Sequence, residues 1–253
     1  MTRSRDGALA IFDAVERHHP DADTELVFRT AFELLVATVL SAQSTDRRVN
    51  EVTPALFARY PSPAALAQAA PAEVEALIHS TGFFRQKARA VIGLSAALVE
   101  EHGGAVPADM DALVALPGVG RKTANVVLGH ALGVPGFPVD RHVLRVAARL
   151  GLIHTDDAVK AEAVLTALLP KARWTRASDT LILHGRRICM PTPKCDLCHA
   201  RTLCPFAMTT AQPRASAKTP PRAKMPPRGK APSRAATPPR AKLGSSATPR
   251  VRR

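Results

Sequence analysis

The chain has 253 residues and a net charge of +14, and this length is enough for one large domain or two small ones. Residues 1–7 are polar and charged, and the longest apolar run, near residues 34–40, is too short to span a bilayer. We therefore expect no secretory signal and no membrane span, and we interpret the protein as soluble and cytoplasmic.

Helical patterns fill the chain up to residue 208, and no convincing strand pattern occurs, so we predict an all-α fold. Abundant alanine and leucine favour helices that pack on helices. From apolar spacing, capping residues and glycine or proline stops, the predicted helices cover residues 28–43, short segments from Pro63 and from Pro71, then 84–102, 110–115, 122–132, 141–150, 155–169 and 176–188.

A glycine turn of sequence Leu-Pro-Gly-Val-Gly-Arg-Lys-Thr occupies residues 116–123, between two predicted helices. This arrangement is a helix-hairpin-helix. Gly118 and Gly120 can offer backbone N–H groups to a DNA phosphate, and the start of the second helix adds a partial positive charge. A nucleotide-binding P-loop is disfavoured because Arg121 separates Gly120 from Lys122 and the preceding segment is helical.

Lys122 and Asp140 form the candidate catalytic pair. An unprotonated amine can attack a sugar carbon that carries a base, and the neighbouring Arg121 and the helix N-terminus favour the unprotonated form. Asp140 follows after one helix and a loop rich in glycine and proline, a length that lets the chain reverse and bring the carboxylate near the lysine. The alternative is that Asp140 only caps the next helix and Lys122 is solvated.

All four cysteines lie within 16 residues, with five, two and five residues between them, at Cys189, Cys195, Cys198 and Cys204. In a cytoplasmic protein this grouping favours a metal site over disulfides. Four thiolates suit zinc or an iron–sulfur cluster, and the spacing alone leaves both open. Lys194, inside a ligand loop, would present its charge to a phosphate.

Residues 209–253 contain twelve lysines and arginines, nine prolines and no acidic residue. Few of the other residues are large and apolar, so the segment cannot bury enough surface to fold. We predict a disordered basic tail that binds nucleic acid without sequence specificity. The alternative is a solubilising tail with no specific partner.

The order of these motifs resembles the endonuclease III family, bifunctional DNA glycosylases of base excision repair in the helix-hairpin-helix superfamily. The resemblance covers about residues 10–207. It is carried by Leu-Ser-Ala-Gln at 40–43, Ser-Thr-Gly-Phe at 80–83, the run 116–128, Val-Asp-Arg-His at 139–142, Leu-Ile-Leu-His-Gly at 181–185 and the four cysteines.

The resemblance implies two helical domains with a DNA-binding cleft between them. Residues 24–135 would form a central bundle, and residues 1–23 with 136–208 would form a second domain that holds a [4Fe–4S] cluster, with zinc as the alternative. It implies that Lys122 attacks the deoxyribose C1′ of an oxidised pyrimidine nucleotide, so that the base leaves and the strand is cleaved by β-elimination. Asp140 would assist by electrostatics and proton transfer.

The implied partner is double-stranded DNA that contains oxidised pyrimidines or abasic sites, bound by a monomer associated with the nucleoid. Gln43 and Phe83 would fill the gap left by a flipped nucleotide, although core packing is the alternative for Phe83. The other predicted DNA contacts are Gly118, Gly120, Arg121, His142 and Lys194.

Two positions depart from the family pattern. The first cysteine spacing is five residues where the family usually has six, and Arg141 replaces the usual threonine after Asp140.

Two other functions are alternatives to a bifunctional glycosylase. An adenine-mismatch glycosylase shares the hairpin, the aspartate and the cluster but lacks a lysine at the position of Lys122. A non-catalytic DNA-binding protein would form no covalent intermediate.

Overall fold

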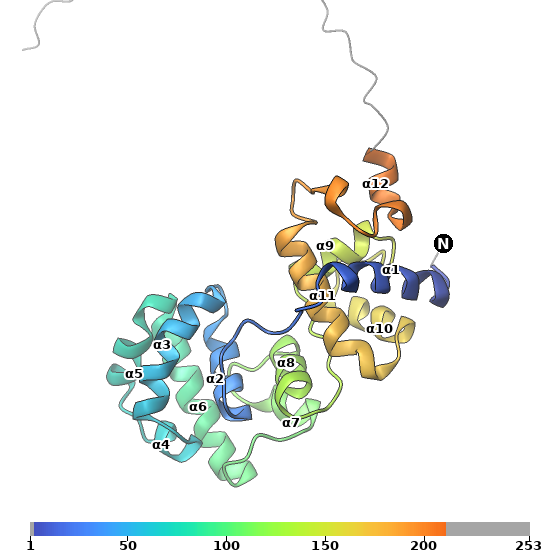
Figure 1. The fold of residues 1–253 in the computed structure, drawn as a ribbon. Helices are drawn as coiled ribbons and strands as arrows, with labels where there is room; N and C mark the ends of the chain where they lie inside the picture. The colour runs from blue at the N-terminus through green and yellow to red at the C-terminus, as the bar shows by residue number, and fades with distance from the viewer. Residues whose placement is uncertain (1–2, 211–253) are drawn as a thin grey trace, which may run out of the picture. The chain divides into compact units, whose positions relative to one another are not determined.

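The computed structural model describes residues 3–210, which form the all-helical fold that the sequence predicts (Figure 1). Its α-helices are α1 Arg5–His18, α2 Ala31–Leu40, α3 Asp46–Arg59, α4 Pro63–Ala67, α5 Pro71–Ile78, α6 Phe84–His102, α7 Met110–Ala115, α8 Arg121–Ala131, α9 Arg141–Arg149, α10 Ala158–Leu168, α11 Trp174–Arg187 and α12 Pro205–Thr210. Short 3-10 turns lie at His79–Thr81, Lys171–Arg173, Cys195–Leu197 and Arg201–Leu203. Within residues 3–210 there is no strand, and no helix has the length and apolar character needed to cross a membrane.

Local signals account for most helix ends. Ser62 caps α4 by accepting a hydrogen bond from Ala65 N at 3.2 Å, and prolines open α4 and α5 as predicted. Gly103 ends α6 with a left-handed φ of 60°. The predicted helices therefore exist, with ends that shift by a few residues.

The structure differs from the predicted helices in several places. The helix predicted to start at Thr155 begins later, because Asp157 caps α10 and its Oδ1 accepts hydrogen bonds from the backbone N–H groups of residues 159 and 160. Helix α3 was missed because its sequence is polar and contains Pro54. The last helix, α12, was not predicted and extends to Thr210, and the remainder of the predicted tail lies outside the described residues.

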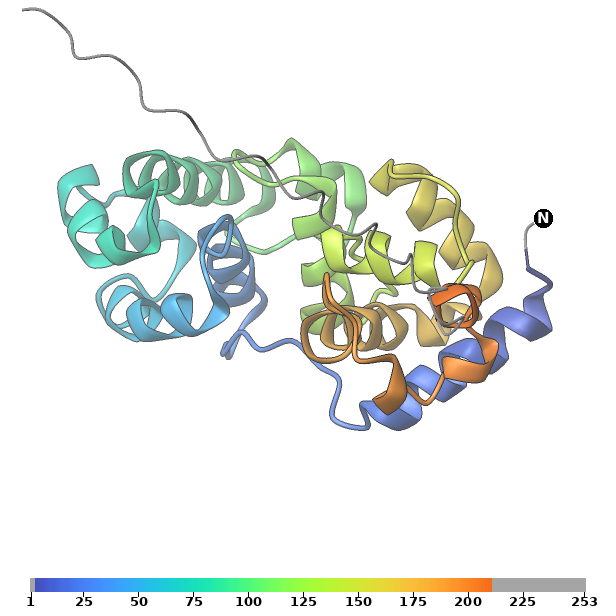
Figure 2. The same cartoon turned by 90° about the horizontal axis from the view of Figure 1, so that it is seen from above.

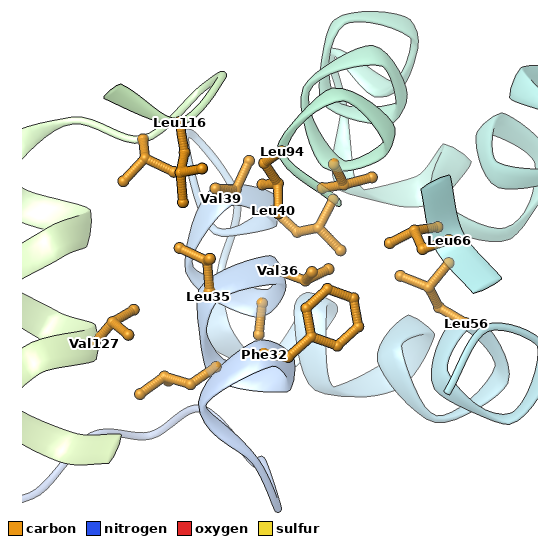
Figure 3. Packing of buried hydrophobic residues seen from close by; sticks show 14 of the residues in the cluster. Phe32, Leu35, Val36, Val39, Leu40, Leu56, Leu66, Leu94, Leu116 and Val127 are labelled. Atoms are coloured by element: carbon orange, nitrogen blue, oxygen red, sulfur yellow. The ribbon is translucent and has the colours of Figure 1, made fainter. Parts of the chain in front are cut away.

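Helix α2 is the centre of the first apolar core. Residues 32–40 are all buried, so α2 has no polar face and packs against neighbours on all sides. Figure 3 shows Leu35 pointing toward Val127 of α8, while Val36 points toward Leu56 of α3. This central position explains why α2 reads in the sequence as an almost continuous apolar run.

A second apolar core combines both ends of the described chain. Side chains of α1, including Phe12, are buried with residues of α9, α10 and α11. The chain therefore passes between the two cores twice, at residues 16–25 and 129–136 (Figures 1 and 2). The predicted domain boundaries, after residues 23 and 135, fall in these segments, and the division into two domains stays a prediction.

Candidate active site

The glycine turn joins α7 to α8. Val119 N donates to Leu116 O at 3.1 Å, which closes the turn. Gly118 has a φ of +75°, and a Cβ there would lie 2.8 Å from Ala90 Cβ, so backbone angle and space both exclude a side chain. A Cβ on Gly120 would meet only open space. The turn is therefore packed against the protein at Gly118 and open to an approaching molecule at Gly120.

The N-terminus of α8 has no side-chain cap, whereas α7, α9 and α10 each begin with a capping aspartate. The first N–H groups of an uncapped helix are available to an external acceptor, and the helix dipole adds a partial positive charge there. A phosphate fits such an end. The open glycine and the uncapped helix together favour a phosphate at this place.

Arg121 directs its charge toward α10. Its Nε and Nη2 donate to the two carboxylate oxygens of Glu162, at 2.9 and 2.8 Å. Glu162 also accepts from Asn125 Nδ2 at 3.1 Å. The guanidinium is thus neutralised within the protein, which weakens the effect on Lys122 that the sequence suggested. The DNA contact of Arg121 stays a prediction.

Lys122 lies in the first turn of α8 and borders a cavity whose walls include residues of both apolar cores, among them Leu26 and Ile182. Most of the residues that line it have polar side chains. The polar residues come from four separate stretches of the chain and are Asp23, Thr24, Glu25, Thr38, Ser41, Asp46, His130, Asp179 and Arg186. Lys122 therefore lies next to both the uncapped helix end and this cavity.

Asp140 is the N-cap of α9. Its Oδ1 accepts hydrogen bonds from His142 N at 2.7 Å and from Val143 N at 2.9 Å. The residue is half-buried and is not among those that border the cavity of Lys122. The structure therefore shows its capping role directly, and its catalytic role stays a prediction.

The loop that leads to Asp140 is held against α8. Phe137 N donates to Asn125 Oδ1 at 3.0 Å. A Cβ on Gly136 would lie 2.2 Å from Asn125 O, so the loop approaches α8 as closely as only glycine allows. This packing holds the loop that precedes α9 against the helix that carries Lys122.

Arg186 of α11 is linked to both candidate catalytic residues, Lys122 and Asp140. It borders the cavity of Lys122, contacts Glu25, and lies 2.9 Å from Asp46 Oδ2. Burial alone would lower the pKa of Arg186, but the surrounding carboxylates, including Asp140, outweigh burial and raise it. The charge of Asp140 therefore acts on a guanidinium at the edge of the lysine's cavity.

His130 borders the same cavity, about two helical turns after Lys122 on α8. Its Nδ1 lies 3.3 Å from Asp23 Oδ1, and its Nε2 lies 3.3 Å from Asp179 Oδ1. Burial opposes protonation of the ring, but the hydrogen bonds and charges of the two carboxylates outweigh it and raise the pKa of His130. When it is protonated, the ring ties α8 to α11 and to the segment before α2.

We expect His130→Gln to reduce the pH dependence of stability above pH 6.5. Because the pKa of His130 is raised in the folded state, protonation of the ring stabilises the fold, and this stabilisation is complete below pH 6.5, the usual histidine pKa. It is lost as the pH rises through the raised pKa. Between pH 6 and pH 9, the free energy of unfolding of the wild type should therefore fall by on the order of 1 kcal/mol more than that of the variant. Thermal unfolding across this range measures it, with the exposed His154→Gln as control. Equal slopes for wild type and His130→Gln would contradict the assignment.

Gln43 and Phe83, the residues predicted to enter the DNA helix, share a rare backbone conformation. Their φ angles are +53° and +49°, and they are the only non-glycine residues with a positive φ in the described part of the chain. Both are exposed, Phe83 to 63%, which excludes core packing for Phe83. A left-handed backbone at a bulky residue is unfavourable and is typical of functional turns.

His142 lies in the first turn of α9 and is half-buried. Its Nδ1 is 3.0 Å from Arg145 Nη2, and because a guanidinium only donates, Nδ1 must accept. Burial lowers the pKa of His142, so the neutral ring carries its proton on Nε2. The Nε2–H group is the donor that the predicted DNA contact would use.

The four cysteines surround one small cavity, and none forms a disulfide. Burial raises the pKa of Cys198 and of Cys204, and the neighbouring thiols raise it further, so the sulfurs lie close together. Arg149 Nη1 donates to Cys189 Sγ at 3.5 Å. Clustered thiols with a cation beside them fit a metal held by thiolates. Lys194 borders the same cavity.

Two histidines that the sequence pattern did not indicate lie against this loop. His19 Nε2 is 3.1 Å from His184 Nδ1, and His184 Nε2 is 3.5 Å from Cys198 Sγ. Burial lowers the pKa of His19 to about 4 and that of His184 to about 3, so both rings are neutral. If His19 donates to His184, then His184 can donate to the sulfur. The end of α1 thus lies beside the four-cysteine loop (Figure 2).

Comparison with known proteins gives sequence matches over most of the chain. Residues 36–171 match the HhH-GPD superfamily of base excision DNA repair proteins. The chain is 47% identical over 212 residues to the endonuclease III of Synechocystis sp., which covers 83% of this chain and 97% of the relative. It is 44% identical over 194 residues to the endonuclease III of Bacillus subtilis, which covers 76% and 89%.

Solved structures give a matching result. A trapped endonuclease III–DNA covalent intermediate has a TM-score of 0.78 and 41% identity to this chain, and the match covers 83% of this chain and 99% of that one. A thermostable thymine-DNA glycosylase has a TM-score of 0.72 and 21% identity over 81% of this chain and 98% of its own, which shows a shared fold.

Proposed function

Because the chain belongs to the endonuclease III family of the HhH-GPD superfamily of base excision DNA repair proteins, we propose that it excises oxidised pyrimidines from duplex DNA with Lys122 as the nucleophile. The chain is a DNA glycosylase and abasic-site lyase of base excision repair. Beyond this activity, we propose which lesion is excised and which roles the individual residues have.

The position of Lys122 carries this proposal. Lys122 follows directly after an uncapped helix N-terminus that fits a phosphate, and it borders a cavity lined by both polar and apolar side chains. A phosphodiester bound at the turn of Gly118 and Gly120 would place the adjoining deoxyribose near Nζ. A nucleotide turned out of the helix could then direct its base toward the cavity.

The chemistry needs a neutral Lys122. The Nζ lone pair forms a bond to C1′, and the damaged base leaves with the electrons of the glycosidic bond and takes up a proton. The C1′–O4′ bond then breaks, O4′ takes up a proton and the nitrogen loses one, which gives the Schiff base. The Schiff base acidifies the protons on C2′. Loss of one of these protons expels the 3′-phosphate, which cleaves the strand, and water then releases the amine.

Asp140 supports these steps through its second carboxylate oxygen. Oδ1 is occupied by two helix N–H groups, so Oδ2 is the oxygen that can stabilise positive charge at C1′ or transfer a proton. The two hydrogen bonds on Oδ1 fix the orientation of the carboxylate. We propose that this fixed orientation is what the reaction uses.

Gln43 and Phe83 are proposed to occupy the space that the extruded nucleotide leaves in the duplex. Both project from exposed turns in strained backbone conformations. An apolar ring suits this position because it stacks against the neighbouring bases. His142, through Nε2–H, and Lys194 would add phosphate contacts.

The test is borohydride reduction, which traps the Schiff base as a stable adduct. The protein is incubated with duplexes that contain thymine glycol, an abasic site, adenine opposite guanine, or no damage. We expect adducts with thymine glycol and with the abasic site alone. Binding without any adduct would overturn the nucleophile, and an adduct confined to the abasic site would overturn the choice of lesion.

For the cofactor we propose a [4Fe–4S] cluster held by the four cysteines, as the family membership and the grouped thiols support. The cluster would order the loop at residues 189–204 so that Lys194 faces DNA. The bound group would serve this structural role, because Lys122 and Asp140 supply the groups that the reaction needs.

We expect the purified protein to contain about four iron and four sulfide per chain and to absorb broadly near roughly 400 nm. Cys198→Ser should lower the iron content strongly because it removes one of four ligands. Lys194→Gln, in the same loop, should leave the iron content unchanged. Metal analysis and absorbance measure both, and a colourless protein with stoichiometric zinc would overturn the cluster.

A further inference from the structure

Phe83 lies in a tight turn between α5 and α6. The 3-10 turn His79–Thr81 is followed by Gly82 with a φ of +71° and by Phe83 with a φ of +49°. Helix α6 begins at the next residue and has no side-chain cap. Because a left-handed φ is unfavourable for phenylalanine, contacts around the turn must hold this conformation.

Lys87, in the first turn of α6, makes two of those contacts. Its side chain is buried, with the residue 5% exposed, and its Nζ donates to Thr81 O at 2.8 Å. Its backbone N donates to Phe83 O at 3.0 Å. One residue thus holds the chain just before Gly82 and again at Phe83.

The charge of Lys87 is not explained by an ion pair. Burial lowers the pKa of Lys87, and no charge among the described residues contributes to the shift. A buried ammonium without a carboxylate partner is costly, and an apolar side chain of similar length could fill the same space without that cost. The group that the ammonium serves is the carbonyl oxygen of Thr81.

We propose that Lys87 is a positioning residue for Phe83, and that its ammonium fixes the backbone at residues 81–83 so that the exposed ring is already oriented to enter the DNA helix. This inference rests on the proposed role of Phe83. Fixing the ring in advance favours extrusion of the nucleotide because no ordering of the turn is then needed when DNA binds.

A double-mutant cycle tests the inference with Lys87→Met, Phe83→Ala and the combined variant. The first readout is the fluorescence of 2-aminopurine opposite a stable abasic-site analogue, which rises when the base unstacks. The second is single-turnover cleavage at a natural abasic site under saturating enzyme. We expect each single variant to lower both readouts at least about threefold, and the combined variant to fall no lower than Phe83→Ala alone.

Arg85→Met is the matched control, because it removes an exposed cation from the same turn of α6. It should leave the fluorescence unchanged. Lys87→Arg should recover part of both readouts. Thermal unfolding shows which variants are folded, and Lys87→Gln replaces Lys87→Met in the cycle if the latter is unfolded.

The outcomes separate the two proposals. If Phe83→Ala changes neither readout, the proposed role of Phe83 is wrong and the inference falls with it. If Phe83→Ala lowers both readouts but the effects of the two substitutions multiply, Lys87 does not act through Phe83. A Lys87→Met variant that is less stable but extrudes the nucleotide normally would show a purely structural role and would also overturn the inference.

Discussion

Lys122→Gln is expected to bind damaged duplex DNA and to form no covalent adduct with it. Glutamine keeps a polar side chain of similar length but has no amine, so neither attack at C1′ nor a Schiff base is possible. Strand cleavage at an abasic site should fall by roughly 10³-fold or more. The substitution lies in an exposed first turn without a side-chain cap, so the Tm should change little.

Lys160→Gln is the matched control for this variant. Lys160 also lies exposed in the first turn of a helix, α10, and does not border the lysine's cavity. It should trap with borohydride like wild type. Persistent adduct formation by Lys122→Gln would place the Schiff base on another amine and would remove the central step of the proposed reaction.

Asp140→Asn is expected to fold and to bind DNA, but to turn over more slowly by roughly 10²- to 10⁴-fold. Asparagine is as good an N-cap as aspartate, so the hydrogen bonds from His142 N and Val143 N are retained. The substitution removes the charge and the proton-accepting oxygen. The measurement is single-turnover release of the damaged base, together with the Kd for the same duplex.

The chain offers a close control at Asp157. This residue caps α10 with the same pattern, in which one carboxylate oxygen accepts from two backbone N–H groups. Asp157→Asn removes a capping charge that lies away from the cavity of Lys122. If Asp140→Asn releases the base as fast as Asp157→Asn does, Asp140 has only its capping role.

The features that the sequence predicted depend on residues close together in the chain. The turn at Gly118 could be predicted because its left-handed φ demands glycine there. Helix starts at Pro63 and Pro71 follow from the fixed φ of proline. The four-cysteine loop spans only 16 residues. Such signals survive in any tertiary arrangement, since they are satisfied locally.

Other expectations based on neighbouring residues were wrong because a second residue took part in the interaction. Thr155 and Asp157 both have capping side chains, and the sequence does not show which one the helix uses. Arg121 looked like a free cation beside Lys122, but Glu162, 41 residues away, neutralises it. The sequence contains both charges and says nothing of their distance.

By itself, the sequence determined that the protein is helical, that a glycine turn precedes Lys122, and that four thiols are grouped, because short-range geometry specifies each of these. Only the tertiary structure decided what surrounds the amine. Arg186 meets its carboxylate partners across 140 and 161 residues, and His130 bridges aspartates from two other segments. These contacts arise from the packing of whole helices, which no local pattern in the sequence records.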